Sequence, residues 1–305
     1  MSAPPVPSDG AEDVRAGNAD TGADPPAREI VVGVDGSECA LGAVRWAVQE
    51  AARRDAPLRI LHAATYLGRP ESSGAPPPEL PRARRITAQA FTVARHTAPG
   101  VQSSTEVVPA DPVPTLLRAG AGAQLLVLGS STTGAADELV LASVALRVAA
   151  RSTQPVVVVP RQRTEPAGRP AVAVLGVGDG ADDEAVALFA ADAAQRSGVG
   201  LSVLQTRPPR RAVPSWVDDD EEWGRRFPDL EVHRSELPAA RADHVLRATC
   251  PSPLLVISAG ESGLLHRTLD NSHRWLLRHC TSPMALVPPV HRSQQEPQGE
   301  VLAPD

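Results

Sequence analysis

The feature that most constrains this sequence is an internal repeat. The run AVAVLGVGDG matches IVVGVDGS earlier in the chain, and PLLVISAGESG matches LLVLGSSTTG. Gly176 lies 143 positions after Gly33, whereas Ser258 lies 129 positions after Gly129, so the second copy is fourteen residues shorter between these landmarks. Self-similarity on this scale indicates two copies of one structural unit. We therefore predict two domains, which agrees with a length of 305 residues.

Each repeat alternates short apolar runs with longer amphipathic stretches. Residues 30–34 and 156–159 are unbroken apolar runs, typical of strands that are buried on both faces of a sheet. Residues 38–53 carry Ala and Val on one helical face, and Ser37 stands where a helix cap belongs. Further helices are expected at residues 82–96, 113–123 and 138–151. This order predicts an α/β, Rossmann-like fold of two tandem five-stranded parallel sheets with flanking helices.

Composition places the domain boundaries. Residues 1–27 and 291–305 lack apolar periodicity and are expected to be disordered tails. A polar linker at residues 162–168 is expected to separate the first repeat, residues 28–161, from the second repeat, residues 169–290. We call the first repeat domain 1 and the second repeat domain 2.

Charge and cysteine content exclude several classes of function. The net charge of −6 gives no global attraction to nucleic acid or to an anionic membrane. The three cysteines are far apart, which disfavours both a disulfide framework and a zinc cluster. The N-terminus does not resemble a signal peptide, and no apolar run is long enough to span a bilayer. We therefore expect a cytoplasmic protein that binds neither nucleic acid nor membranes.

The ends of the predicted strands form the candidate site. In an open parallel sheet, ligands bind beyond the carboxyl ends of the strands, where the strand order reverses. Asp35, Ala63 and Gly129 follow the first, second and fourth strands of the first repeat. The GSSTTG segment after the fourth strand offers hydroxyls and backbone amides before a helix, which is a setting that can hold a phosphate. The segment has neither the Lys of a P-loop nor the GxGxxG spacing.

These residues resemble the universal stress protein family. The resemblance rests on IVVGVDGS followed by an amphipathic helix, and on QLLVLGSS followed at the family's distance by PVVVVP. It covers residues 28–160 and, more weakly, residues 169–288. It implies a five-stranded parallel sheet in each domain and ATP bound at a loop of the pattern Gly-x2-Gly-x9-Gly-(Ser/Thr).

The resemblance also implies which positions contact the nucleotide. Gly33 and Asp35 match the turn after the first strand, where the Asp meets adenine, and Ala63 matches the backbone position beside the base. The phosphate loop and its end, where a hydroxyl and an amide contact phosphate, are matched by Leu128, Gly129, Thr132, Ala142, Ser143 and Val144.

Departures from the family pattern predict that ATP binding by domain 1 is weak. Thr132 and Ala142 replace the second and third glycines of the loop, and a Cβ there narrows the approach of phosphate to the backbone. Asp137 and Glu138 add negative charge beside the same site.

Domain 2 is expected not to bind ATP. Gly178 stands where the Asp that contacts adenine belongs, and Glu261 would oppose a phosphate. The expected role of domain 2 is to pair with domain 1 as a pseudo-dimer, as two domains of the family do. We expect two separate sheets, each with its fifth strand at an edge near the domain interface.

Several residues also have purely structural explanations. Asp35 could cap the turn into the following helix, and Ser143 could bond its own helix backbone. Residues 218–223, DDDEEW, are predicted to form a solvated acidic loop, and the four tryptophans are predicted to pack in cores or interfaces. The histidines near the C-terminus are spaced seven and six apart, which does not align metal ligands on one helix turn.

Two functions remain open from the sequence. The first is a regulatory protein of the stress response that binds an adenine nucleotide in domain 1 and acts on an unidentified protein partner. The second is a nucleotide-free interaction scaffold that kept the fold and lost the ligand. An enzyme is not expected, because the sequence offers no evident general base and no set of metal ligands.

Overall fold

The structure is a computed structural model of the 305-residue chain. It describes residues 28–65, 80–130, 138–161, 171–176, 181–206, 220–237, 242–249, 251–259 and 271–288. The predicted tails and the predicted linker lie outside these described residues. Within the described part of the chain, no helix has both the length and the apolar character needed to cross a membrane.

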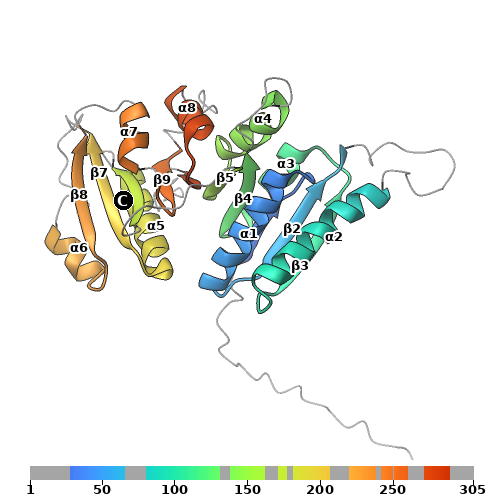
Figure 1. Cartoon of the computed structure of the whole chain (residues 1–305), viewed down its shortest axis with the longest axis horizontal. Helices are drawn as coiled ribbons and strands as arrows, with labels where there is room; N and C mark the ends of the chain where they lie inside the picture. Colours follow the sequence, from blue (N-terminus) through green and yellow to red (C-terminus); the bar gives the residue numbers. More distant parts are fainter. Residues whose placement is uncertain are drawn as a thin grey trace, which may run out of the picture.

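The first repeat folds as alternating strands and helices (Figure 1). Its strands are β1 (Ile30–Gly33), β2 (Leu58–Ala63), β3 (Ser103–Val108), β4 (Leu125–Ser130) and β5 (Val156–Pro160). Its helices are α1 (Glu38–Arg53), α2 (Leu80–Thr97), α3 (Pro112–Ala121) and α4 (Glu138–Ala149). The predicted helices are confirmed, with ends within two residues of the expected positions.

The second repeat follows the same order. Its strands are β6 (Ala171–Gly176), β7 (Gly200–Thr206), β8 (Val232–Leu237), β9 (Leu255–Ser258) and β10 (Met284–Val287). Its helices are α5 (Ala181–Ser197), α6 (Asp220–Arg226), α7 (Ala242–Thr249) and α8 (Asn271–His279). The connection from β2 to β3 has 39 residues and the one from β7 to β8 has 25, so the fourteen-residue deficit falls in this connection.

The acidic stretch of the second repeat does not form a loop where the structure describes it. Residues 220–226 form helix α6, and Trp223 is buried with only 2% of its surface exposed. Glu222 pairs with Arg225 and Arg226 within the same helix. The prediction of a solvated loop is therefore wrong for these residues, because burial of the indole and local ion pairs stabilise a helical turn. The packing role predicted for this tryptophan is confirmed.

The ten strands that the structure describes form a single sheet, in the order β3-β2-β1-β4-β5-β10-β9-β6-β7-β8. Within each repeat the strands are parallel, which confirms the α/β class. The two fifth strands pair with each other in antiparallel fashion, with Ala285 opposite Val157. The prediction of two separate sheets is therefore wrong, whereas the expected position of both fifth strands at the junction of the two repeats is confirmed. Both strands are fully buried, and an unpaired buried edge would leave backbone N–H and C=O groups without partners.

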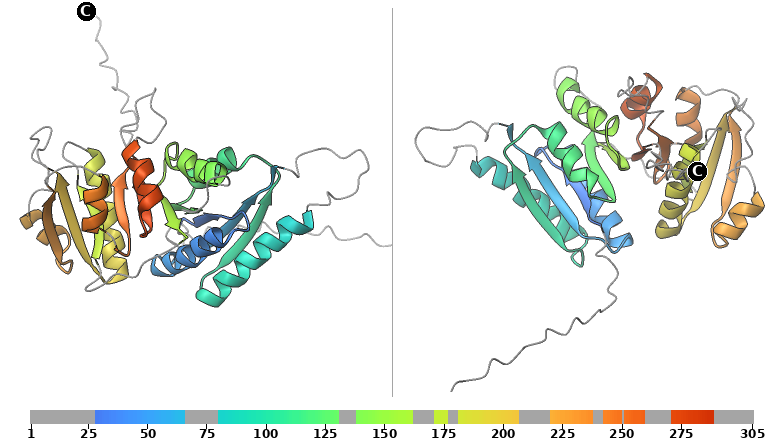
Figure 2. Two further views of the ribbon diagram at one scale, coloured as in Figure 1. Left: turned by 45° about the horizontal axis from the view of Figure 1, so that its top comes forward. Right: turned by 180° about the vertical axis from the view of Figure 1, so that it is seen from behind.

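Helices cover both faces of the long sheet (Figure 1, Figure 2). Residues of α1, α2, α5 and α6 share one hydrophobic cluster with one face of the strands. Residues of α3, α4, α7 and α8 share a second cluster with the opposite face. Both clusters contain residues of both repeats, so the apolar core runs across the β5–β10 pair.

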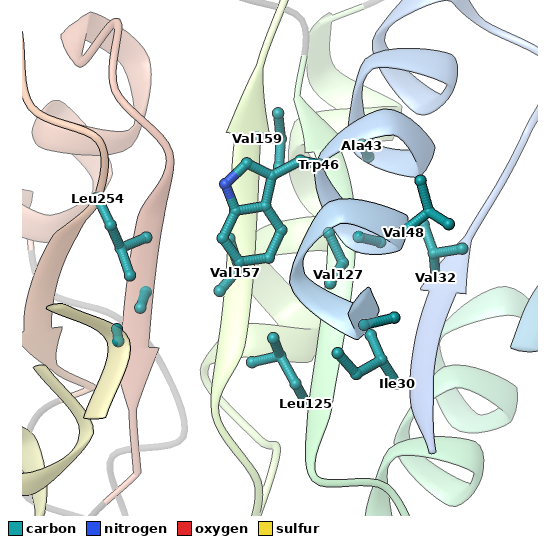
Figure 3. Packing of buried hydrophobic residues seen from close by; sticks show 14 of the residues in the cluster. Ile30, Val32, Ala43, Trp46, Val48, Leu125, Val127, Val157, Val159 and Leu254 are labelled. Atoms are coloured by element: carbon teal, nitrogen blue, oxygen red, sulfur yellow. The ribbon is translucent and has the colours of Figure 1, made fainter. Parts of the chain in front are cut away.

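Trp46 fills the core next to this central pair. Its side chain projects from α1 and is 5% exposed. Figure 3 shows the indole lying against Val157 and Val159 of β5, with Leu254 of the second repeat on the far side of that strand. A side chain of this size covers β5 on the α1 face, where the cores of the two repeats meet.

Charged residues join the C-terminus of α1 to α5. Arg54, at the C-terminus of α1, contacts Glu50 at 2.6 Å and Asp192 of α5 at 3.0 Å. Its guanidinium also lies over the ring of Phe189, 5.6 Å from the centroid. The side chains of Arg54 and Glu50 are 9% and 5% exposed. This ion-pair cluster links the two repeats on the α1 face.

Candidate functional site

A pocket of about 130 Å³ opens at the carboxyl ends of β1 and β4. The two strands are neighbours in the sheet although β2 and β3 intervene in the chain, so the strand order reverses at this point. This is where an open α/β sheet binds its ligands. Strands β1, β2 and β4, helices α1, α3 and α4, and the turn after β1 provide the lining, namely Gly33, Val34, Asp35, Ser37, Ala40, Leu61, Ala63, Pro112, Leu116, Leu128, Gly129, Val144 and Ala145.

Most of the sequence-predicted contact positions meet in this pocket. The structure brings together Gly33, Asp35, Ala63, Leu128, Gly129 and Val144. Thr132 lies outside the described residues. Ala142 and Ser143 lie within α4, and their side chains are outside the described part of the structure.

The turn between β1 and α1 holds the one carboxylate among the lining residues. Gly36 has φ of +89°, a left-handed conformation that favours glycine, and it reverses the chain into the helix. The Oδ1 atom of Asp35 accepts a hydrogen bond from the backbone N–H of Ser37 at 2.9 Å. Ser37 in turn caps α1, because its Oγ accepts from the N–H of Ala40 at 3.2 Å. The predicted Ser37 cap is confirmed. Asp35 thus holds the turn into α1 and also lines the pocket.

Two glycines lie where side chains would collide. A Cβ on Gly129 would lie 2.5 Å from the carbonyl oxygen of Cys39 and 2.8 Å from the backbone nitrogen of Ala40. A Cβ on Gly33 would lie 2.7 Å from Leu128 and 2.8 Å from Leu116. Gly129 therefore allows the first turn of α1 to pack directly on β4. That packing requires a glycine at this position whether or not a phosphate binds nearby.

The apolar wall formed by α3 was missed by sequence reasoning. Asp111 caps this helix through the N–H of Val113 at 3.0 Å, and Pro112 occupies its first turn. The cap and the proline fix the start of α3, from which Pro112 and Leu116 line the pocket. An Asp-Pro pair shortly after the third predicted strand was the signal that could have revealed this wall.

Backbone and side-chain hydrogen bonds link the ends of β1, β2 and β3 at the rim of the pocket. The buried imidazole of His62 places Nδ1 2.7 Å from the carbonyl oxygen of Val34. The N–H of Val34 donates to the carbonyl of Leu61 at 2.9 Å, and the N–H of Ala64 donates to that of Val108 at 2.8 Å. These bonds extend the pairing of the strands past their ends at the carboxyl edge of the sheet.

A thiol and a guanidinium lie beside the first turn of α1. Burial raises the pKa of the Cys39 thiol, and the positive charge of Arg161 opposes that rise while Asp35 adds to it. Arg161 directly follows β5, and its backbone N–H donates to the carbonyl of Ser130 at 3.0 Å. Ser130 is the last residue of β4, so Arg161 lies at the carboxyl edge of the sheet near the pocket.

The corresponding edge of the second repeat is only partly described. Gly178 and Glu261 lie outside the described residues. Ser258 ends β9, whereas its counterpart Gly129 lies one residue before the end of β4, and Asn271 begins α8. Among the residues that the structure describes, no group of three His, Cys, Asp or Glu side chains is placed to hold a metal ion.

Comparisons with known proteins agree with the fold. The model of the universal stress protein family matches residues 26–160. A universal stress protein of Mycobacterium tuberculosis is 30% identical over 250 residues, which cover 76% of this chain and 86% of the relative. Another from the same organism is 28% identical over 271 residues and covers 87% of this chain and 97% of the relative.

A solved structure extends the agreement to the whole fold. The crystal structure of a universal stress protein from Archaeoglobus fulgidus covers 87% of this chain and 97% of its own, with a TM-score of 0.66 and 13% identity. At that identity the similarity establishes the fold, and the mycobacterial relatives establish the family. From the matched sequence and the shared architecture, we conclude that this chain belongs to the universal stress protein family.

Proposed function

We propose that this chain is a regulatory protein of the stress response that binds an adenine nucleotide, ATP, weakly in domain 1. The observation that carries the proposal is the pocket at the carboxyl ends of β1 and β4, which gathers Asp35 and an apolar lining in one cavity. Six of the nine positions that the family resemblance assigns to the nucleotide line this cavity.

The size and chemistry of the pocket suit a base better than a whole nucleotide. Its volume of about 130 Å³ is below the roughly 300–1,000 Å³ of pockets that enclose a complete ligand. Leu116, Leu128 and Val144 provide apolar walls for a flat ring, and the carboxylate of Asp35 can accept a hydrogen bond from an amino group. We assign the ribose and phosphates to the open side of the pocket, near Gly129 and the start of α4.

Weak binding is expected from the residues around the phosphate position. Thr132 and Ala142 replace glycines of the family loop, and Glu138 at the start of α4 adds a negative charge. Domain 2 is assigned no nucleotide, because its sequence lacks the Asp after the first strand and carries Glu261 in the loop.

We assign the two repeats different roles within one protein. We keep the division into domain 1, residues 28–161, and domain 2, residues 169–290, supported by the repeated strand order on either side of the β5–β10 pair. Domain 2 acts as the built-in partner of domain 1, and the assembly signals to another protein rather than catalysing a reaction. We place it in the cytoplasm, because Cys39 and Cys280 are free thiols.

One observation favours a second candidate, a nucleotide-free interaction scaffold. Gly129, which matches the first glycine of the family loop, is required by the packing of α1 whether or not a ligand is present. Its presence is therefore compatible with a chain that retained the fold and lost the nucleotide.

Titration calorimetry of the full-length chain with ATP separates the two candidates. We expect binding with a Kd of about 0.1–1 mM, and Asp35→Asn should weaken it while keeping the hydrogen bond to the N–H of Ser37. The matched control is Asp55→Asn, the same change at the opposite edge of the sheet, where φ of 49° suits Asn. Absence of ATP binding would establish the scaffold, and binding indifferent to Asp35→Asn would show that the nucleotide lies elsewhere.

A further inference from the structure

The proposed nucleotide site has an unbalanced charge. Asp35 lines the pocket, and Glu38 lies in the first turn of α1. A nucleotide would add the negative charge of its phosphate, and the loop after β4 contains no Lys or Arg. A cation that attracts phosphate must therefore come from a segment outside this loop.

Arg161 is placed at the correct edge of the sheet. Strand β5 runs parallel to β4, with Pro160 opposite Ser130. The N–H of Arg161 continues this ladder by donating to the carbonyl of Ser130 at 3.0 Å. Ser130 is the residue from which the loop after β4 departs, so the backbone of Arg161 is tied to the origin of that loop.

The alternation of side chains along β5 determines the direction of Arg161. Val157 and Val159 both belong to the cluster on the α1 face, where they lie against Trp46 (Figure 3). Side chains two apart on a strand point to the same face, and the bond from the N–H of Arg161 to Ser130 continues the ladder one residue past β5, so we infer that Arg161 points toward α1 as well. Its charge acts on the thiol of Cys39 in the first turn of α1, which agrees with this direction.

The guanidinium is available for a ligand. Arg161 is exposed, and among the residues that the structure describes no carboxylate lies within ion-pair distance of it. The arginines at the joint between α1 and α5 are different, because Arg54 is buried between Glu50 and Asp192. A fork of N–H donors on an exposed arginine matches the geometry of phosphate oxygens.

We propose that Arg161 recognises the phosphate of the ligand in domain 1 and makes the site selective for phosphorylated adenine nucleosides over adenosine. The proposal rests on the proposed function. Arg161 takes the place of the missing loop cation, and the base is held by the pocket at the same edge of the sheet. Selectivity for phosphate and affinity for the base are therefore supplied by separate residues.

The test compares AMP with adenosine in calorimetric titrations of the full-length chain and its Arg161→Gln variant. We expect the variant to bind AMP about tenfold more weakly, which corresponds to about 1.4 kcal/mol, and to bind adenosine within a factor of about two of the parent. Raising the salt concentration should weaken AMP binding by the parent more than by the variant, because the variant has lost the charge pair that salt screens.

The matched control is Arg151→Gln. Arg151 is also exposed, and it precedes the amino end of β5, so the control removes one positive charge at the opposite edge of the sheet. We expect it to leave AMP binding unchanged, and Arg161→Lys to keep part of the selectivity because a single ammonium replaces the fork. Thermal unfolding of each variant confirms that the fold is intact.

The outcomes separate the role of Arg161 from the nucleotide site itself. Equal weakening of AMP and adenosine, unchanged AMP binding by Arg161→Gln, or equal effects of Arg151→Gln and Arg161→Gln would each overturn the role of Arg161 while leaving the nucleotide site in place. If the parent binds none of ATP, AMP and adenosine, the proposed function fails and the role of Arg161 fails with it; if it binds ATP alone, a variant Arg161→Gln that binds ATP as tightly as the parent overturns the role of Arg161. If the parent binds adenosine as tightly as AMP and Asp35→Asn weakens both, the pocket assignment holds and the phosphate assignment is wrong.

Discussion

The substitution Gly129→Ala tests why β4 carries a glycine just before its end. A Cβ there would lie 2.5 Å from the carbonyl oxygen of Cys39, 2.6 Å from its carbonyl carbon and 2.8 Å from the nitrogen of Ala40. All three are backbone atoms of the first turn of α1, so no side-chain rotation can relieve the contact. Either β4 or the start of α1 has to move, and α1 packs against β1, β2, β4 and β5.

The expected cost is worked from this geometry. Overpacking a well-filled core costs about 1–3 kcal/mol. Because the added methyl group collides with the backbone of a second core element, we expect the upper part of this range, about 2–3 kcal/mol of the free energy of unfolding. That is a substantial share of the roughly 5–15 kcal/mol that stabilises a typical domain.

Urea unfolding followed by tryptophan fluorescence measures the change, since Trp46 and Trp223 are buried in the native fold. Gly42→Ala is the matched control, because Gly42 lies within α1 and a Cβ there would meet no atom within 4 Å. In the interior of a helix this same change should raise stability by about 0.5–1 kcal/mol. The two variants should therefore move the unfolding midpoint in opposite directions.

One result would refute the reasoning. If Gly129→Ala is as stable as the parent in the absence of nucleotide and loses nucleotide binding, then the glycine serves the approach of the ligand and the packing argument is wrong. A change in stability that equals the effect of Gly42→Ala in sign and size would contradict it as well.

Two further predictions concern the joint between the repeats and the thiol of Cys39. Arg54→Met should lower the free energy of unfolding by about 2 kcal/mol, because it leaves the buried carboxylate of Glu50 with a weaker partner. Asp192→Asn should lower it by under about 1 kcal/mol, because the side chain of Asp192 is 37% exposed. Equal losses in urea unfolding would contradict this order. Burial raises the pKa of the Cys39 thiol above its usual 9.0, so above about pH 9 the thiol ionises first in the unfolded chain, and this ionisation favours the unfolded state. The free energy of unfolding should therefore fall with rising pH more steeply in the parent than in Cys39→Ala. Parallel pH profiles of urea unfolding for the two proteins would exclude this effect.

Much of the candidate site could be predicted from local pattern. Residues 30–35 form an apolar run that ends at an Asp, and this run is followed by a capping Ser, so the strand, the turn and the start of α1 could be located without a structure. The rule that ligands bind where strand order reverses then brought Asp35, Ala63 and Gly129 to one edge. The contribution of α3 to the pocket was missed, because the sequence pattern that predicts a helix does not show which of its side chains line a pocket formed with other elements.

The alternation of strands and helices, the repeat and the helix caps were determined by the sequence alone, because each depends on interactions between residues close together in the chain. The union of the two sheets was decided only in the tertiary structure. Two apolar runs form the central strands, Val156–Pro160 and Met284–Val287. Their sequences would suit equally well an edge strand covered by other elements and a strand paired on both sides in the centre of a sheet. The two strands pair at the centre of the sheet because their buried backbone N–H and C=O groups need partners, which each strand finds on the other although they are far apart in the chain. Trp46 and the ion pairs of Arg54 cover one face of this junction. Such long-range contacts leave no local pattern from which they can be predicted.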